Sequence, residues 1–74
     1  MAKVVKKDGL TGKVIVKQIV PSVADGMAIA KDLLSIHLVE FDEIQSTIQR
    51  GVVYYSIMHF DGTYAPIEVQ VRKR

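Results

Sequence analysis

Two short runs near the N-terminus mix valine and isoleucine with lysine, a composition typical of β-strands. They span residues 3–7 and 13–20 and flank the segment DGLTG, which contains two glycines and an aspartate. Because such a segment favours a tight turn, the pattern predicts a β-hairpin. In the second run Val14, Val16 and Val20 share one side of the predicted strand, which makes that side the better candidate for the core.

The next segment has helical periodicity. Pro21 ends the preceding strand, and Ser22 followed three residues later by Asp25 is a variant of the capping box. We therefore predict a helix over residues 22–37, although Gly26 near its start lowers its intrinsic stability by about 1 kcal/mol relative to alanine. The apolar positions that recur at helical spacing are Val23, Met27, Ala30 and Leu34.

Residues 42–50 have two interpretations. Asp42 is a candidate N-cap and Gly51 follows Arg50 as a C-terminal stop, so the pattern favours a second, short helix that buries Ile44 and Ile48. The alternative is a strand over EIQSTIQ that pairs with the chain from Val52 onward. We take the helix as the prediction and keep the strand as the alternative.

The C-terminal third predicts a second hairpin around Asp61 and Gly62. Residues 64–72 alternate between polar and apolar positions, whereas residues 52–60 are apolar on both sides of the predicted strand. The loop length sets the register, and a shift of one residue exchanges the two faces. A loop of two or four residues sets Tyr54 opposite Val69, and a loop of three sets Tyr55 opposite Ile67, so the choice between the two tyrosines stays open here.

Together these elements predict one α+β domain over residues 1–74. The predicted order is ββααββ, an antiparallel sheet of two hairpins with one long and one short helix packed on one face. Because one layer of helices covers only one face, the apolar residues of the segment 52–60 leave a second face to be buried. We therefore expect a homodimer or a higher homo-oligomer that associates through the sheet.

Composition and charge narrow the class of protein. Hydrophobic residues make up 49% and charged residues 24% of the 74 residues, which indicates a folded domain, and the chain has no cysteine. Residues 1–20 carry five lysines and one aspartate, residues 21–49 carry one lysine and five acidic residues, and residues 50–74 are again basic. No apolar run is long enough for a membrane span and no apolar block follows the N-terminus, so we expect a cytoplasmic protein without membrane contact.

No motif of catalysis or metal binding is evident. The histidines His37 and His59 lie outside any spacing that brings a second ligand close, and no serine lies in a nucleophile elbow. The segment Gly9–Val14 lacks the spacing of a phosphate-binding loop and precedes a strand. We therefore expect no enzyme activity, no cofactor and no metal site.

The function predicted from sequence is a small interaction or assembly module that self-associates through its sheet and binds a protein partner whose identity the sequence does not reveal. The alternative is nucleic-acid binding, in which basic residues contact phosphates and sheet tyrosines stack on bases. Both functions use the same candidate binding residues: Lys13, Lys17, Tyr54, Tyr55, Arg72, Lys73 and Arg74.

Overall fold

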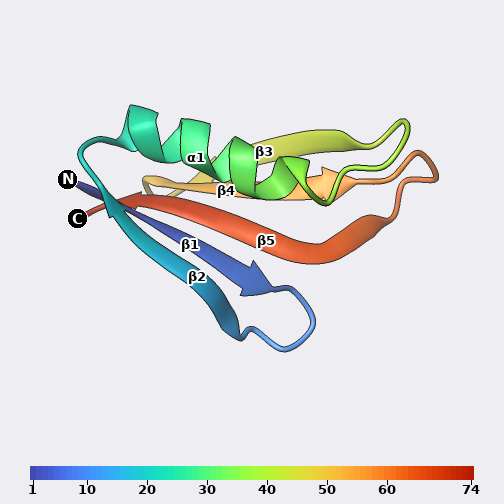
Figure 1. The fold of residues 1–74 in the computed structure, drawn as a ribbon, viewed down its shortest axis with the longest axis horizontal. Helices are drawn as coiled ribbons and strands as arrows, with labels where there is room; N and C mark the ends of the chain where they lie inside the picture. The colour runs from blue at the N-terminus through green and yellow to red at the C-terminus, as the bar shows by residue number, and fades with distance from the viewer.

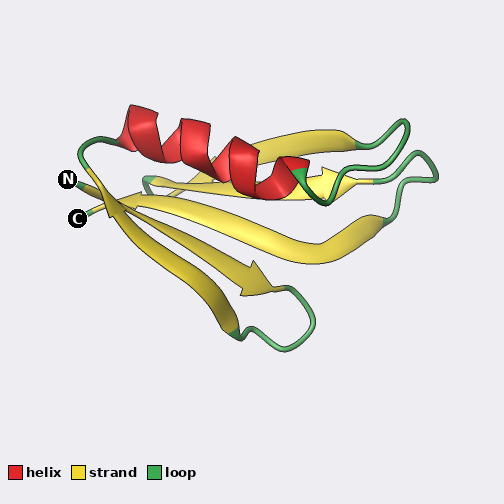
Figure 2. Cartoon of the chain, viewed as in Figure 1, coloured by secondary structure: helices red, strands yellow, loops and turns green.

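The computed structural model describes residues 1–74 and contains one antiparallel sheet of five strands with a single helix on one face (Figure 2). The strands lie in the order β2-β1-β5-β4-β3, so that the first and last strands of the chain are neighbours and the termini meet at one end (Figure 1). The Arg74 N–H donates to the carbonyl of Met1 at 3.0 Å. The elements are β1 (Ala2–Asp8), β2 (Val14–Val20), α1 (Val23–Ser35), β3 (Glu43–Gln49), β4 (Val52–Met58) and β5 (Tyr64–Lys73).

The class α+β and the antiparallel sheet are confirmed, but the predicted order ββααββ is wrong at the fourth element. Residues 43–49 form strand β3 rather than a short helix, so the order is ββαβββ. Arg50 and Gly51, with φ of 52° and 78°, form the two-residue turn to β4 and do not end a helix. Ile44 and Ile48 are four residues apart, a spacing that puts them on one face of a helix and equally on one face of a strand.

The long helix begins as the sequence predicts. Ser22 is the N-cap: its hydroxyl oxygen accepts the Asp25 N–H at 3.1 Å and its O–H donates to the Asp25 carboxylate at 2.9 Å. Helix α1 ends at Ser35, two residues before the predicted boundary. It packs mainly across β5 and β1 and reaches β4 and β2 with fewer contacts.

Gly26 allows this close packing between helix and sheet. It is buried, and a Cβ at this position would lie 2.7 Å from Cγ1 of Val71 and 3.2 to 3.3 Å from methyl groups of Val4 and Val20. The glycine that lowers the helix propensity of the segment is therefore the residue that brings α1 onto the three strands. The core between helix and sheet consists of Ala2, Val4, Val20, Ala30, Leu34, Val53, Tyr55, Ile57, Val69 and Val71.

The register of β4 on β5 decides which tyrosine is inside. Tyr55 pairs with Val69 on the helix side and is 2% exposed, whereas Tyr54 pairs with Gln70 on the opposite face. The turn itself spans the three residues 60–62, since the His59 N–H donates to the Thr63 carbonyl, and this is the loop length that turns Tyr55 inward. After the turn the register shifts by two, because β5 has four residue steps from Tyr64 to Glu68 where β4 has two from Met58 to Ser56. Tyr55, which the sequence proposed as a binding residue, is therefore part of the core and has almost no surface to offer a ligand.

We predict that Gly26→Ala lowers the free energy of unfolding by about 1–2 kcal/mol, because overlap with the stiff Val71 side chain outweighs the gain in helix propensity. Urea denaturation measures the change. Adding Val71→Ala should remove the overlap, so the double variant loses less than the sum of the single losses. Ala28→Gly on the exposed side of α1 controls for propensity alone. A Gly26→Ala variant more stable than the original chain would contradict the packing role.

A second prediction concerns the Tyr55 hydroxyl, which is buried with no hydrogen-bond partner and whose pKa is raised by that burial. Because an unsatisfied buried hydroxyl destabilises the folded state, Tyr55→Phe should raise the free energy of unfolding by about 1 kcal/mol. Thermal or urea denaturation tests this, with Tyr54→Phe on the other face as the control that changes little. A loss of stability in Tyr55→Phe would show that the hydroxyl has a partner.

Candidate functional site

The face of the sheet opposite α1 has no covering layer (Figure 2). The register places its side chains in rows that cross the strands. One row from β2 to β3 contains Lys17, Val5, Gln70, Tyr54 and Thr47. The two flanking rows run Ile19, Lys3, Arg72, Val52 and Gln49 on one side and Val14, Lys7, Glu68, Ser56 and Gln45 on the other. We call these three rows the open face.

Half of the open face is basic. A shallow hollow of about 230 Å³ lies over β2, β1 and β5 and is lined by Lys3, Lys7, Lys17 and Arg72, with Val5, Val14 and Gln70 completing the lining. Four cations thus converge from the N-terminal hairpin, β1 and β2, and from β5 at the other end of the chain. They converge because β1 lies between β2 and β5, so that Lys3 is directly opposite Arg72 and Val5 is directly opposite Lys17.

These cations have no carboxylate partner. Glu68 lies opposite Lys7 in the register, yet the only ion pair within 4.0 Å in the structure joins His59 to Asp42. Arg72 donates from Nη2 to the Gln70 amide oxygen at 2.8 Å, a neutral acceptor. The neighbouring charge of Lys17, followed by partial desolvation and by Arg72, lowers the pKa of Lys3. The basic half therefore has an excess of positive charge that an anion would relieve.

The other half of the open face is polar and aromatic. A second hollow of about 410 Å³ lies over β3, β4 and β5, with Tyr54, Tyr64, Thr47 and Glu68 among its lining residues. Tyr54 is half-buried, and the Tyr64 hydroxyl reaches across β4 to donate to Gln45 at 3.4 Å. Both tyrosines line the second hollow, with Tyr54 next to the basic hollow, opposite its Gln70, and Tyr64 nearer the β4–β5 turn.

This face is less apolar than the sequence pattern suggests. Val52, Tyr54 and Met58 of β4 are each half-buried, because longer polar side chains of the flanking strands lie beside them. Arg72 is opposite Val52, Gln70 is opposite Tyr54, and the Gln45 amide donates to the Met58 sulfur at 3.4 Å. Face-to-face packing of two sheets therefore has less apolar surface to bury than the alternation of residues 52–60 indicates.

The structure separates the candidate binding residues into two groups. It brings Lys17, Tyr54 and Arg72 together on the open face, and it adds Lys3 and Lys7, which the sequence analysis did not select. The alternation of Lys3, Val5 and Lys7 along β1 was a usable signal for this placement, but only strand order shows that β1 lies between β2 and β5. The remaining candidates lie elsewhere: Lys13 in the β1–β2 connection, Lys73 on the helix side of β5, Arg74 at the chain end and Tyr55 in the core.

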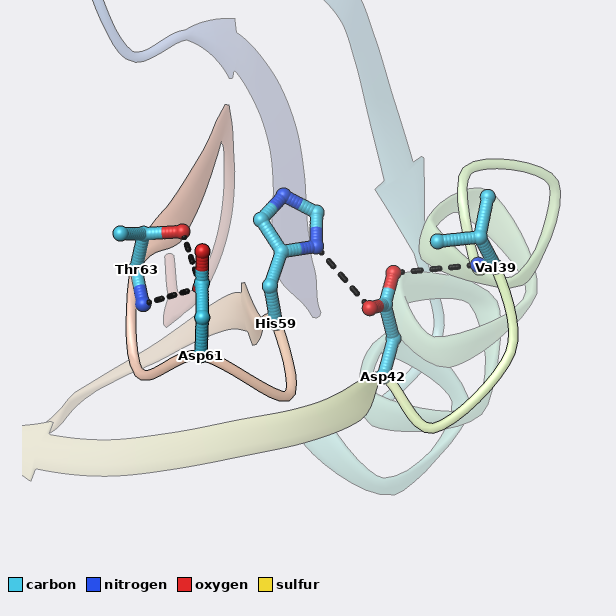
Figure 3. Close-up of polar contacts among 5 residues, drawn as sticks. All are labelled: Val39, Asp42, His59, Asp61 and Thr63. Atoms are coloured by element: carbon cyan, nitrogen blue, oxygen red, sulfur yellow. Dashed lines mark hydrogen bonds and ion pairs between the residues drawn. The ribbon is translucent and has the colours of Figure 1, made fainter.

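A carboxylate and an imidazole join two loops at the end of the sheet far from the termini (Figure 3). The His59 Nδ1 lies 2.9 Å from Asp42 Oδ1, and the second carboxylate oxygen accepts the Val39 N–H at 3.0 Å. These hydrogen bonds, with that from His59 the stronger influence, lower the pKa of Asp42. Next to this pair the rings of Phe41 and Phe60 pack against each other at a centroid distance of 5.6 Å and an interplanar angle of 50°. Asp42 therefore ties the α1–β3 connection to the β4–β5 turn.

The same turn contains a second hydrogen-bonded carboxylate. Asp61 accepts the Thr63 hydroxyl at 2.6 Å and the Thr63 N–H at 3.0 Å, and both bonds lower the pKa of Asp61 (Figure 3). No group of three or more His, Asp or Glu side chains lies close enough together to hold a metal ion. No helix is both long enough and apolar enough to cross a membrane.

We predict that Asp42→Asn flattens the acid dependence of stability. Because the pKa of Asp42 is lower in the folded chain than in the unfolded chain, its carboxylate contributes stability that is complete above the ordinary value of about 4 and is lost as the pH falls through the lowered value. Asp42→Asn should therefore reduce stability at pH 7 and approach the original chain at low pH. Urea titrations at several pH values measure this, with Glu40→Gln as an exposed control. An identical pH profile for the original chain and Asp42→Asn would contradict the role of the pair.

Comparison of the chain with protein-family models, with curated proteins and with solved structures finds no match in any of the three.

Proposed function

We propose that this protein is a small non-enzymatic module that binds single-stranded nucleic acid on its open face. The supporting observation is the convergence of Lys3, Lys7, Lys17 and Arg72, without an ion pair to any carboxylate, on an uncovered sheet face that also carries Tyr54. Proteins that bind single strands combine these two features: cations that follow the backbone and aromatic rings on which bases stack.

The arrangement of the rows favours a single nucleic-acid strand that binds across the β-strands of the sheet. Lys17 and Tyr54 lie in one row, separated by β1 and β5, which is a distance of about 14 Å at ordinary strand spacing. A nucleic-acid chain that runs along this row would therefore have phosphates over the lysines and bases over the tyrosine. Thr47 and Gln49, both exposed, offer hydrogen-bonding groups beside the same path.

The face favours a single strand over other anionic partners. A duplex keeps its bases stacked inside, so it would use the cations but leave Tyr54 and Tyr64 without a role. An anionic lipid surface would likewise use the cations alone, and the exposed large apolar residues nearest to them, Val14 and Ile19, are aliphatic side chains on the sheet edge and not an amphipathic helix.

The test is fluorescence anisotropy with a labelled oligothymidylate and a labelled oligoadenylate over a range of salt concentrations. With about four phosphates neutralised, log Kd should change with log salt with a slope near 3, because each neutralised phosphate of a single strand contributes about 0.7. Lys17→Gln should weaken binding and reduce the slope by about 0.7. The control Lys31→Gln removes the same charge from α1 on the other side of the molecule and should leave both values unchanged.

Two further experiments separate the contribution of base stacking to binding from the contribution of charge. Tyr54→Leu should weaken binding by about 1–3 kcal/mol with little change in slope, since it removes a stacking surface and no charge. Vesicles containing phosphatidylserine and a duplex of equal length serve as competitors. Equal or better competition by vesicles or duplex, or equal losses from Lys17→Gln and Lys31→Gln, would contradict the proposal.

A further inference from the structure

The two edges of the sheet differ in how they are protected. Edge strand β2 has Lys17 near its middle, and its register with β1 shifts between Lys6 and Lys7. Charges and bulges of this kind are common protections against pairing with another chain. Edge strand β3 has a charge only at its first residue, Glu43. From Ile44 to Gln49 it contains no charge and no proline, and its register with β4 is continuous.

The hairpin geometry identifies the backbone groups on the free edge of β3. The two-residue turn Arg50–Gly51 makes Gln49 and Val52 the pair that closes the hairpin. In an antiparallel ladder the hydrogen-bonding direction alternates from residue to residue, so Gln49, Thr47 and Gln45 turn their backbone groups toward β4. Ile44, Ser46 and Ile48 therefore turn their N–H and C=O groups toward the open edge.

We propose that a second copy of this chain pairs with the β3 edge, antiparallel and about a twofold axis at Ser46. This register sets Ser46 opposite Ser46 and Ile44 opposite Ile48, so each outward-facing residue exchanges two hydrogen bonds with its counterpart. A twofold interface must be complementary to itself, and the segment IQSTI has isoleucines at equal distances from its central serine. The proposal does not depend on nucleic-acid binding, because β3 contributes none of the cations of the open face.

The side chains of β3 are compatible with a second copy of the chain as the partner. Ile48 is 72% exposed on the helix side of β3, where α1 makes few contacts, and Ile44 is half-buried. Pairing would set each Ile48 against Ile44 of the second copy. At the ends of the contact the exposed Glu43 would lie beside Arg50 of the second copy, so the two basic ends meet the two acidic ends.

The interface predicted here is small. One strand pair lies at the low end of the range for specific interfaces, so the dimer should dissociate on dilution with a Kd above about 1 μM. Its axis is perpendicular to the sheet, so both open faces would lie on the same side of a continuous ten-stranded sheet.

Sedimentation equilibrium over a concentration series tests the proposal, and circular dichroism confirms that each variant is folded. The original chain should show a monomer–dimer equilibrium. Ile48→Lys places charges against the second copy and should raise the Kd by at least about tenfold. The matched control Ile19→Lys changes an exposed isoleucine of β2 and should leave the Kd unchanged. Monomer alone at every concentration, or a dimer that Ile19→Lys disrupts and Ile48→Lys does not, would overturn the proposal.

A cysteine trap tests the register directly and does not depend on the stability of Ile48→Lys. The chain has no cysteine of its own. Residues that face each other in a hydrogen-bonded pair have Cα atoms about 5.5 Å apart, within the range for a disulfide. Ser46→Cys should therefore give a covalent dimer under mild oxidation. Gln49→Cys should not, because the register puts the two copies of residue 49 at opposite ends of the contact. Equal cross-linking of both variants would overturn the register.

Discussion

The structure depends on the close packing of α1 against the sheet at Gly26. A side chain at this position would overlap Val71, and its absence lets the helix lie directly on Val4, Val20 and Val71. These three valines come from β1, β2 and β5, so this one contact joins the N-terminal hairpin to the last strand. The buried interior is built around that junction, and its remaining members extend toward β4.

One helix of 13 residues covers only part of a five-stranded sheet. It lies over the middle strands on one face and leaves the opposite face and the β3 edge without a protein layer. These two uncovered regions differ in their side chains. Long polar and charged side chains occupy the open face and cover the apolar residues of β4, whereas β3 carries no charge from Ile44 to Gln49 and has an exposed isoleucine. The proposed ligand and the proposed second copy use these two regions separately.

Sequence patterns predicted correctly those elements that are determined by interactions between residues close in sequence. The Ser22 cap, the alternation of residues 64–72 and the DGLTG turn each specify their element through neighbouring residues, and all three are confirmed. Residues 42–50 were mispredicted because Asp42, Ile44, Ile48 and Gly51 fit a helix and a hairpin equally well. The structure uses Asp42 as a partner of His59 across the loops, a contact that no local pattern reveals.

Other features follow from pairing between distant segments. The three-residue turn over residues 60–62 puts Tyr55 and not Tyr54 into the core, and the sequence left that loop length open. The two extra residues of β5 between Tyr64 and Glu68 then change the partner of Tyr55 from Ile67 to Val69 without exchanging the faces. The basic hollow exists because β1 lies between β2 and β5, a strand order that the lysine positions alone do not specify. Lys3 and Lys7 were missed for this reason, while Lys17 and Arg72 were found as members of basic segments.

The central claim is that the face opposite α1 is the binding face, and chemical-shift mapping by NMR during titration with a single-stranded oligonucleotide tests it most directly. Binding on this face should concentrate the shift changes at Val5, Gln70 and Tyr54 and leave Ala30 and Leu34, on the buried side of α1, unchanged. Changes centred on α1, or no changes at oligonucleotide concentrations well above the protein concentration, would contradict it.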